Sequence, residues 1–169
     1  MSTSPERLNK LIISDDARDA FSRLISHAAH SLHVTAYAIS KASALDSHLH
    51  TSVYRQLIDA PARGIHCQML IATHPTNSPH EANNTLSAIE LARAGWHVRR
   101  ATRSPIMHAK LLIADENAAM IGSHNLTRAG IETNRELSIV TTDYMIVQPA
   151  LQWFSIMYET AAKHQDVQP

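Results

Sequence analysis

The alternation of short apolar runs with amphipathic stretches limits the fold of this chain more than any other feature. Residues 32–39 (LHVTAYAI) and 65–72 (IHCQMLIA) are short, apolar and partly β-branched, as strands are. Residues 15–31, 47–62 and 80–94 instead place their apolar side chains at helical spacing. Strands that alternate with helices in this way predict an α/β domain.

The second half of the chain has a different pattern, in which strands follow one another closely. Strands are predicted at 96–100, 108–114, 118–122 and 136–141, and an amphipathic helix at 148–162. Clustered strands favour antiparallel pairing and hence a mixed sheet. We therefore expect one domain over residues 1–169, with a mixed β-sheet sandwiched between α-helices.

Composition excludes several classes of protein. Lys and Arg together number 15, as do Asp and Glu, so no global basic field draws this chain to nucleic acid. The one cysteine, Cys67, cannot form an intramolecular disulfide and is expected to be buried. The first residues show no apolar core of a signal peptide, and no run is long enough to span a membrane. We expect a cytoplasmic protein without a membrane segment.

Four polar side chains interrupt the apolar stretch 106–125, IMHAKLLIADENAAMIGSHN. In an extended strand His108 and Lys110 share one face, and Ser123 and Asn125 share a face in the same way. If the two segments lie side by side, an imidazole, an ammonium, a hydroxyl and an amide surround one small space. Lys, Ser and Asn bind anionic oxygens, so this set can hold a phosphate while the imidazole attacks it.

A carboxylate is expected to orient the imidazole. Glu136 begins a predicted strand and can accept a hydrogen bond from Nδ1 of His108, which leaves Nε2 as the nucleophile. Asp115 is the other candidate, but it lies in the predicted turn Asp115-Glu116-Asn117. We expect Asp115 to stabilise this turn or to bind a structural partner.

The spacing His108-x-Lys110-x4-Asp115-x6-Gly122-Ser123-x-Asn125 resembles the HKD motif of the phospholipase D superfamily. Glu136 matches the position of the carboxylate in the small bacterial endonucleases of that superfamily. The resemblance covers most of the chain, from the helix at residue 15 to the last helix. It places six residues in the catalytic set, namely His108, Lys110, Asp115, Ser123, Asn125 and Glu136.

The resemblance also implies a mechanism and an assembly. Two HKD motifs meet at one site, where one His becomes a covalent phosphohistidine and the other protonates the leaving oxygen. Neither a metal nor another cofactor is required. Because this chain has one His-x-Lys motif, the resemblance implies a homodimer with a shared active site. The implied activity is that of a nuclease, with DNA preferred over RNA as the partner.

Other polar residues near the motif are candidates for substrate binding. We expect contacts with backbone phosphates from Arg100, Arg103 and Arg128, whereas Asn134 either shapes the loop before Glu136 or touches substrate. The twelve histidines raise the question of a metal site, but no set of them has the companions of a zinc site, so none is predicted. Two alternatives stay open: a phospholipase D that acts on phospholipids, and a nuclease or nucleic-acid-binding module of a larger defence or repair system.

Overall fold

The computed structural model describes residues 8–40 and 48–161, which form three layers around one sheet. Seven strands make up the sheet in the order β1-β7-β6-β5-β2-β3-β4. Their bounds are Asn9–Ile13 (β1), Ser31–Ala36 (β2), His66–Ile71 (β3), His97–Arg100 (β4), Lys110–Ala114 (β5), Ala118–Gly122 (β6) and Leu137–Thr141 (β7). β2, β3 and β4 are parallel, while the other neighbours pair antiparallel. The predicted mixed sheet is thereby confirmed.

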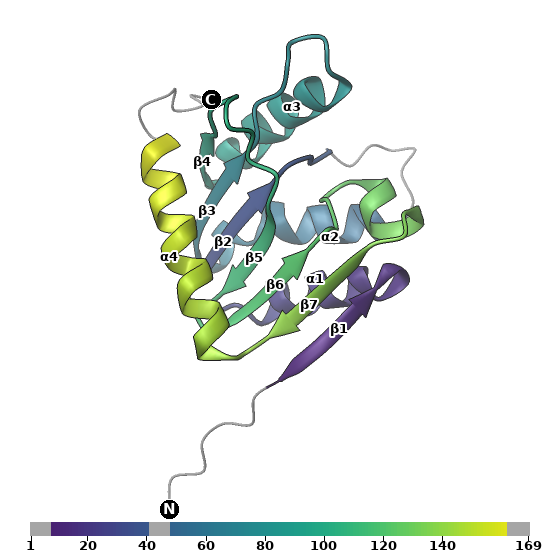
Figure 1. Cartoon of the computed structure of the whole chain (residues 1–169), viewed down its shortest axis with the longest axis vertical. Helices are drawn as coiled ribbons and strands as arrows, with labels where there is room; N and C mark the ends of the chain where they lie inside the picture. Colours follow the sequence, from purple (N-terminus) through teal and green to yellow (C-terminus); the bar gives the residue numbers. More distant parts are fainter. Residues whose placement is uncertain (1–7, 41–47, 162–169) are drawn as a thin grey trace, which may run out of the picture.

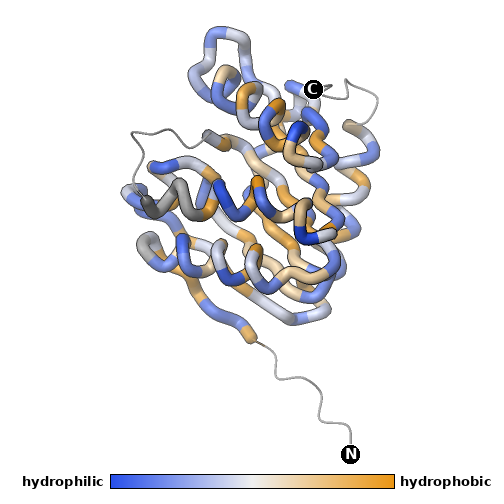
Figure 2. Tube along the Cα trace, turned by 180° about the vertical axis from the view of Figure 1, so that it is seen from behind, coloured by the Kyte–Doolittle hydropathy of each residue, from blue (hydrophilic) through white to orange (hydrophobic). Residues whose placement is uncertain are grey.

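Helices cover the two faces of the sheet unequally. The four α-helices are Ala17–His27 (α1), His48–Asp59 (α2), Pro79–Arg93 (α3) and Tyr144–Ala161 (α4). α1, α2 and α3 contribute to the core on one face, and α4 packs against β2, β3 and β4 on the other. Seen from behind, the strands beneath the helices carry most of the hydrophobic colour (Figure 2). None of the helices in the described ranges has the length and apolar character that a membrane crossing requires.

The large core residues follow the predicted pattern of strands and helices. Cys67 is buried, as expected, and so are Trp96 and Phe154. Trp153 is different, because 38% of its surface is exposed. Neighbouring positions on a helix point about 100° apart, so the burial of Phe154 turns Trp153 away from the centre of the core.

Several elements differ from the sequence predictions: α4 begins at Tyr144 rather than at residue 148, β2 ends at Ala36 rather than at residue 39, and α2 ends at Asp59 rather than at residue 62. Three further differences concern β1, α1 and β5. Strand β1 was not predicted, and it completes the sheet as an edge strand paired with β7. Helix α1 ends at His27 rather than at residue 31 because the Asp115 carboxylate binds the next backbone N–H groups. Strand β5 begins at Lys110, so His108 lies just before the strand.

Candidate active site

One edge of the sheet gathers the polar residues of the motif. β5 runs antiparallel to β2, so its first residue, Lys110, lies near the carboxyl end of β2. β6 runs back along β5 and pairs Gly122 with Lys110, and β7 begins beside the end of β6. Topology alone thus brings three segments distant in sequence to one edge, which Figure 1 shows at the upper ends of β2, β5 and β6.

His108 and Lys110 form a close pair on this edge. The Lys110 ammonium donates to the carbonyl oxygen of His108 at 2.8 Å, and its Nζ lies 3.1 Å and 3.2 Å from the two ring nitrogens. The His108 ring is exposed, whereas Lys110 is half-buried. The imidazole is therefore accessible to a substrate that the adjacent cation can bind.

Ser123 connects the motif to Glu136. Its hydroxyl donates to the Glu136 carboxylate and accepts from the backbone N–H of Leu137 at 3.0 Å. Asn134 donates its side-chain amide to the other carboxylate oxygen at 3.0 Å. In the described structure no hydrogen bond joins Glu136 to His108, contrary to the expectation from sequence. The two polar neighbours fix the carboxylate instead.

Gly122 allows the two strands beside Ser123 to approach this closely. A Cβ built on Gly122 would lie 2.1 Å from the Ser138 hydroxyl oxygen and 2.4 Å from the Ser138 Cα. Such contacts cannot be relieved by rotating a side chain, because one of the atoms is backbone. The glycine that precedes Ser123 is therefore required by the packing of β6 against β7.

Asn125 projects from the segment that follows Ser123. Its Oδ1 accepts from the backbone N–H of Ala38 at 3.3 Å, which fixes the orientation of the amide because an N–H requires an acceptor. No described residue accepts from its Nδ2, so this donor remains available to an anion. Asn125 is half-buried and its backbone touches Gly130, where a Cβ would come within 2.5 Å of the Asn125 carbonyl.

The electrostatics of the site favour a neutral imidazole beside a half-buried cation. Partial burial, followed by the charge of Lys110 and the nearby His74, lowers the pKa of His108 below its ordinary value. Burial also lowers the pKa of Lys110, against the attraction of Glu136. At neutral pH His108 is therefore mostly uncharged and has a lone pair for nucleophilic attack.

The Glu136 carboxylate is held in its charged form. Burial alone would raise its pKa, but hydrogen bonds from Ser123 and Asn134, together with nearby His124 and Lys110, lower it overall. His124 itself is 1% exposed and shares a hydrogen bond with the Ser138 hydroxyl, so it faces away from the site. The edge thus holds a fixed negative charge close to the Lys110 ammonium.

Asp115 lies apart from the other motif residues, at the opposite end of β5. With Glu116 it forms the two positive-φ residues of a tight turn between β5 and β6. Its carboxylate accepts the backbone N–H groups of Ala29, His30 and Ser31 at distances from 2.7 to 3.1 Å. The resemblance grouped Asp115 with the catalytic residues, but its position fits the structural role expected from the turn.

The arginines divide into a structural group and an exposed group. Arg100 was expected to bind phosphate, but its guanidinium donates to both oxygens of Glu81, at 2.8 and 2.9 Å, and to the Ala72 carbonyl. Its side chain is only 13% exposed, so it holds β4 to α3 instead. Arg103 is exposed, and the ion partner of Arg128 among the described residues is Glu132, at i,i+4. These two remain accessible to a substrate.

Two residues of the site were missed from the sequence. Tyr37 follows β2 and its ring centroid lies 4.2 Å from that of His108. His74 follows β3, is 3% exposed, and packs its ring against Tyr37 at 4.6 Å. The available signal was topological: both follow parallel strands, whose carboxyl ends share one edge.

Among the described residues, no cluster of three or more His, Cys, Asp or Glu side chains is arranged to hold a metal.

Comparison with protein families agrees with this geometry. The profile described as "Cardiolipin synthase, PLD-like domain" matches residues 21–158. The chain belongs to this family. The match begins in α1 and ends in α4, so it includes every motif residue.

Individual relatives show how far the likeness extends. Cardiolipin synthase A of Pseudomonas aeruginosa (strain LESB58) is 33% identical over 84 residues, which are 50% of this chain and 17% of the relative. The aligned part is thus a small fraction of the curated relative.

Among solved structures, Nuc of Salmonella typhimurium, a phospholipase D family member, superposes with a TM-score of 0.76 at 20% identity, covering 91% of this chain and 95% of Nuc. NucT of Helicobacter pylori superposes with a TM-score of 0.73 at 21% identity, covering 91% of this chain and 97% of NucT. At these identities the structures show a shared fold.

Proposed function

We propose that this PLD-like domain is a metal-independent nuclease that hydrolyses phosphodiester bonds through a phosphohistidine on His108. The observation that carries the proposal is the exposed imidazole of His108 with the Lys110 ammonium 3.1 Å from Nδ1. A nucleophile and a phosphate-binding cation thereby share one accessible point. Lys110 and the free Nδ2 of Asn125 supply the positive electrostatics that developing charge on phosphate oxygens requires.

The reaction proceeds in two displacements at phosphorus. In the first, a neutral ring nitrogen of His108 forms a P–N bond as one P–O bond breaks. The leaving oxygen takes a proton from the imidazolium of His108 of the partner subunit, a charged form that the negative charge of the bound phosphate favours. In the second, that same partner imidazole removes a proton from water, whose oxygen attacks phosphorus and breaks the P–N bond. The enzyme returns to its starting protonation state, and the products are a phosphomonoester and an alcohol.

Nucleic acid is the proposed substrate class, with DNA as the first choice. The overall architecture supports it, because the chain aligns with nearly the whole length of Nuc and NucT and with only 17% of the cardiolipin synthase. The exposed Arg103 and the accessible Arg128 suit contacts with the repeated phosphates of a polynucleotide. A single phospholipid headgroup offers no such repeat.

An uncovered apolar surface supports the proposed homodimer. Leu11, Ile13 and Leu137 are 54–55% exposed, and pairing of β1 with β7 places them on the face of the sheet that α4 leaves open. Figure 1 shows β6, β7 and β1 beside α4 with no helix over them on that side. Leu137 follows Glu136 directly, so a second copy bound here would lie next to the site. This apolar surface, defined by Leu11, Ile13 and Leu137, suits a two-fold interface.

Sedimentation velocity tests the dimer. Leu137→Asp places a charge within the apolar surface and is expected to convert a dimer to a monomer and to abolish cleavage. Leu86→Asp is the matched control, because Leu86 is 57% exposed on α3, away from this surface. A wild-type monomer that cleaves DNA with its full rate would refute the shared site.

A groove beside Lys110 favours a second candidate function, the turnover of phospholipids. A groove of about 270 Å³ lies beside Lys110 and is lined mainly by apolar residues, namely Ala109, Leu111, Ile121, Gly122, Ala150 and Trp153. Such a groove suits the glycerol and acyl parts of a phospholipid, and cardiolipin synthases are among the relatives. The two functions predict different products from the same imidazole.

The deciding experiment compares wild type and His108→Ala on labelled DNA, RNA and phosphatidylglycerol vesicles in excess EDTA. The proposed function predicts cleavage of DNA that survives chelation and requires His108. Turnover of phospholipid alone would favour the second function. Cleavage of DNA that is lost with EDTA would refute the metal-independent mechanism.

A further inference from the structure

Tyr37 contacts both members of the His108–Lys110 pair, although it lies outside the motif. The centroid of its ring is 4.2 Å from that of the His108 ring, with the two planes tilted by 57°. The same ring lies beneath the Lys110 ammonium, whose Nζ is 4.6 Å from the centroid. One aromatic side chain thus touches the nucleophile and the cation together.

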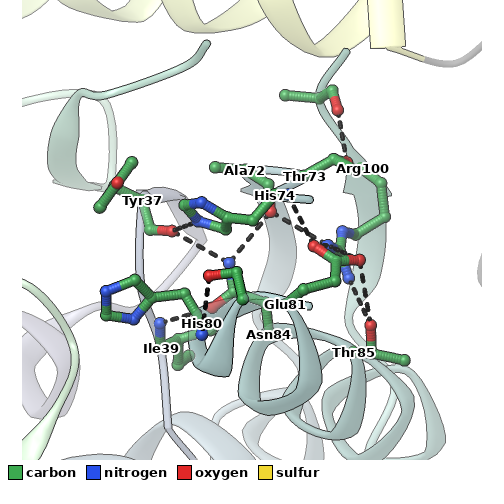
Figure 3. A network of polar contacts seen from close by, with 12 residues as sticks. Tyr37, Ile39, Ala72, Thr73, His74, His80, Glu81, Asn84, Thr85 and Arg100 are labelled. Carbon is green, nitrogen blue, oxygen red and sulfur yellow. Dashed lines mark hydrogen bonds and ion pairs between the residues drawn. The ribbon is translucent and has the colours of Figure 1, made fainter. Parts of the chain in front are cut away.

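The backbone of Tyr37 is fixed by buried polar side chains. Asn84, which is fully buried, donates to the carbonyl oxygens of Tyr37 and Ala72 at 3.0 Å and accepts from the N–H of Ile39 at 2.9 Å. His74 donates from Nε2 to the same Tyr37 carbonyl at 2.8 Å. Figure 3 shows these contacts meeting at the amino end of α3. The carbonyl of Tyr37 therefore has two buried donors, and the segment after β2 is held firmly.

The same network extends to the salt bridge between β4 and α3. The backbone N–H of His74 donates to Glu81 at 2.7 Å, and Glu81 receives the guanidinium of Arg100 (Figure 3). The His74 ring then meets the Tyr37 ring nearly edge-on, at 81°. The ring of Tyr37 is thus in contact with His74 and with His108. Its backbone is held by hydrogen bonds that connect to one largely buried ion pair, Arg100–Glu81.

Lys110 needs such a support for a physical reason. A lysine side chain has four rotatable bonds, and holding its ammonium at one point costs conformational entropy. The face of an aromatic ring attracts a cation, most strongly where water is partly excluded, and leaves the ammonium free to donate hydrogen bonds. The other charged or titratable groups that face this ammonium are His108, which touches it, and Glu136, which attracts it from the start of β7.

We propose that Tyr37 is a positioning residue, whose ring holds the Lys110 ammonium and the His108 imidazole in the geometry that phosphate attack requires. The kinetic part of this inference rests on the proposed function, whereas the positioning itself does not. The ring, not the hydroxyl, performs this role. Tyr37→Phe should therefore preserve it and Tyr37→Leu should remove it.

Kinetics provide the first test. Tyr37→Leu is expected to lower kcat about tenfold or more, because the ammonium and the imidazole lose the ring that holds them. Tyr37→Phe is expected to stay within about threefold of wild type, because it keeps the ring. Tyr144→Leu, which removes an aromatic side chain exposed at 69%, is the matched control. Equal losses in the Phe and Leu variants, or no loss in either, would overturn the proposal.

Nuclear magnetic resonance provides a test that needs no substrate. In the wild-type protein the ε-methylene protons of Lys110 should resonate upfield of those of an exposed lysine, because the Nζ bonded to that methylene lies 4.6 Å from the Tyr37 ring centroid. Tyr37→Phe should retain this ring-current shift, and Tyr37→Leu should reduce it. Ordinary ε-proton shifts for Lys110 would overturn the proposal even if the protein cleaves DNA. A clear upfield shift in a protein without nuclease activity would support the positioning and refute only the proposed function.

Discussion

Replacing Asp115 by Asn separates a structural role from a catalytic one. The carboxylate accepts three backbone N–H groups between α1 and β2. At roughly 1.5 kcal/mol each, the low value for bonds to a charged group in a partly solvated turn, they contribute about 4.5 kcal/mol. Oδ1 accepts from all three N–H groups and Oδ2 accepts a second time from Ala29. The oxygen of Asn can keep the bonds to His30 and Ser31 in a weaker, uncharged form, but its NH2 group would face the N–H of Ala29 in place of Oδ2. Asn tolerates the positive φ of this position. We expect Asp115→Asn to lose about 2 to 3 kcal/mol of stability.

Urea denaturation measures this loss directly. Glu116→Gln is the matched control, because it removes the same charge from the same turn without removing an acceptor of these N–H groups; it should change the free energy of unfolding by less than about 0.5 kcal/mol. The folded Asp115→Asn protein should retain the kcat of the wild type. A variant with wild-type stability but a hundredfold lower kcat would refute the structural role and return Asp115 to the catalytic set.

The pH dependence of the stability difference between wild type and Asp115→Asn provides a second check. Burial alone would raise the pKa of Asp115, but the backbone N–H groups of Ser31, Ala29 and His30 outweigh it and lower the pKa overall. Because the folded pKa lies below the unfolded one, the stabilisation is fully present above the unfolded pKa. It is lost as the pH falls through the folded pKa. The difference in free energy of unfolding between wild type and Asp115→Asn should therefore become smaller only at acidic pH.

Three further predictions follow from the site. Gly122→Ala should destabilise the protein by about 2 to 4 kcal/mol in urea denaturation, because its Cβ would overlap Ser138; a change below about 0.5 kcal/mol would contradict the packing. Arg103→Ala should raise the KM for DNA and reduce the salt dependence of that KM, with the stability of the protein unchanged. Arg100→Ala should instead lower the melting temperature, because it removes the ion-pair partner of Glu81. The acid limb of kcat/KM should lie below the ordinary pKa of histidine, since burial and nearby cations lower the pKa of His108; a limb above that value would argue against a neutral nucleophile.

Local sequence patterns predicted most of the elements because each has a strong period. β6 has the predicted bounds, and β3, β4, β7 and α3 agree within about one residue at each end. The edge strand β1 lies in a segment without clear alternation, because four of its five residues are exposed, the apolar Leu11 and Ile13 among them. Its pairing with β7 joins residues more than 120 positions apart, which no local pattern encodes.

Strand alternation and the motif predicted part of the candidate site. The predicted proximity of His108 and Lys110 follows from a period of two. Tyr37 and His74 were missed because their place depends on which strands neighbour β5, a property of the whole sheet. The expected phosphate contact of Arg100 failed for a related reason: Glu81, nineteen residues earlier, meets it only when α3 packs against β4.

The most direct measurement of the central claim is the capture of the covalent intermediate. DNA labelled at the scissile phosphate is mixed with a slight excess of enzyme in EDTA, quenched in alkali after a fraction of a turnover, digested, and analysed by mass spectrometry. The proposed mechanism predicts an acid-labile phosphoramidate on the peptide that contains His108, and none in His108→Ala. Rapid cleavage by wild type with no adduct at any time, or an adduct on another residue, would contradict the assignment of His108 as the nucleophile.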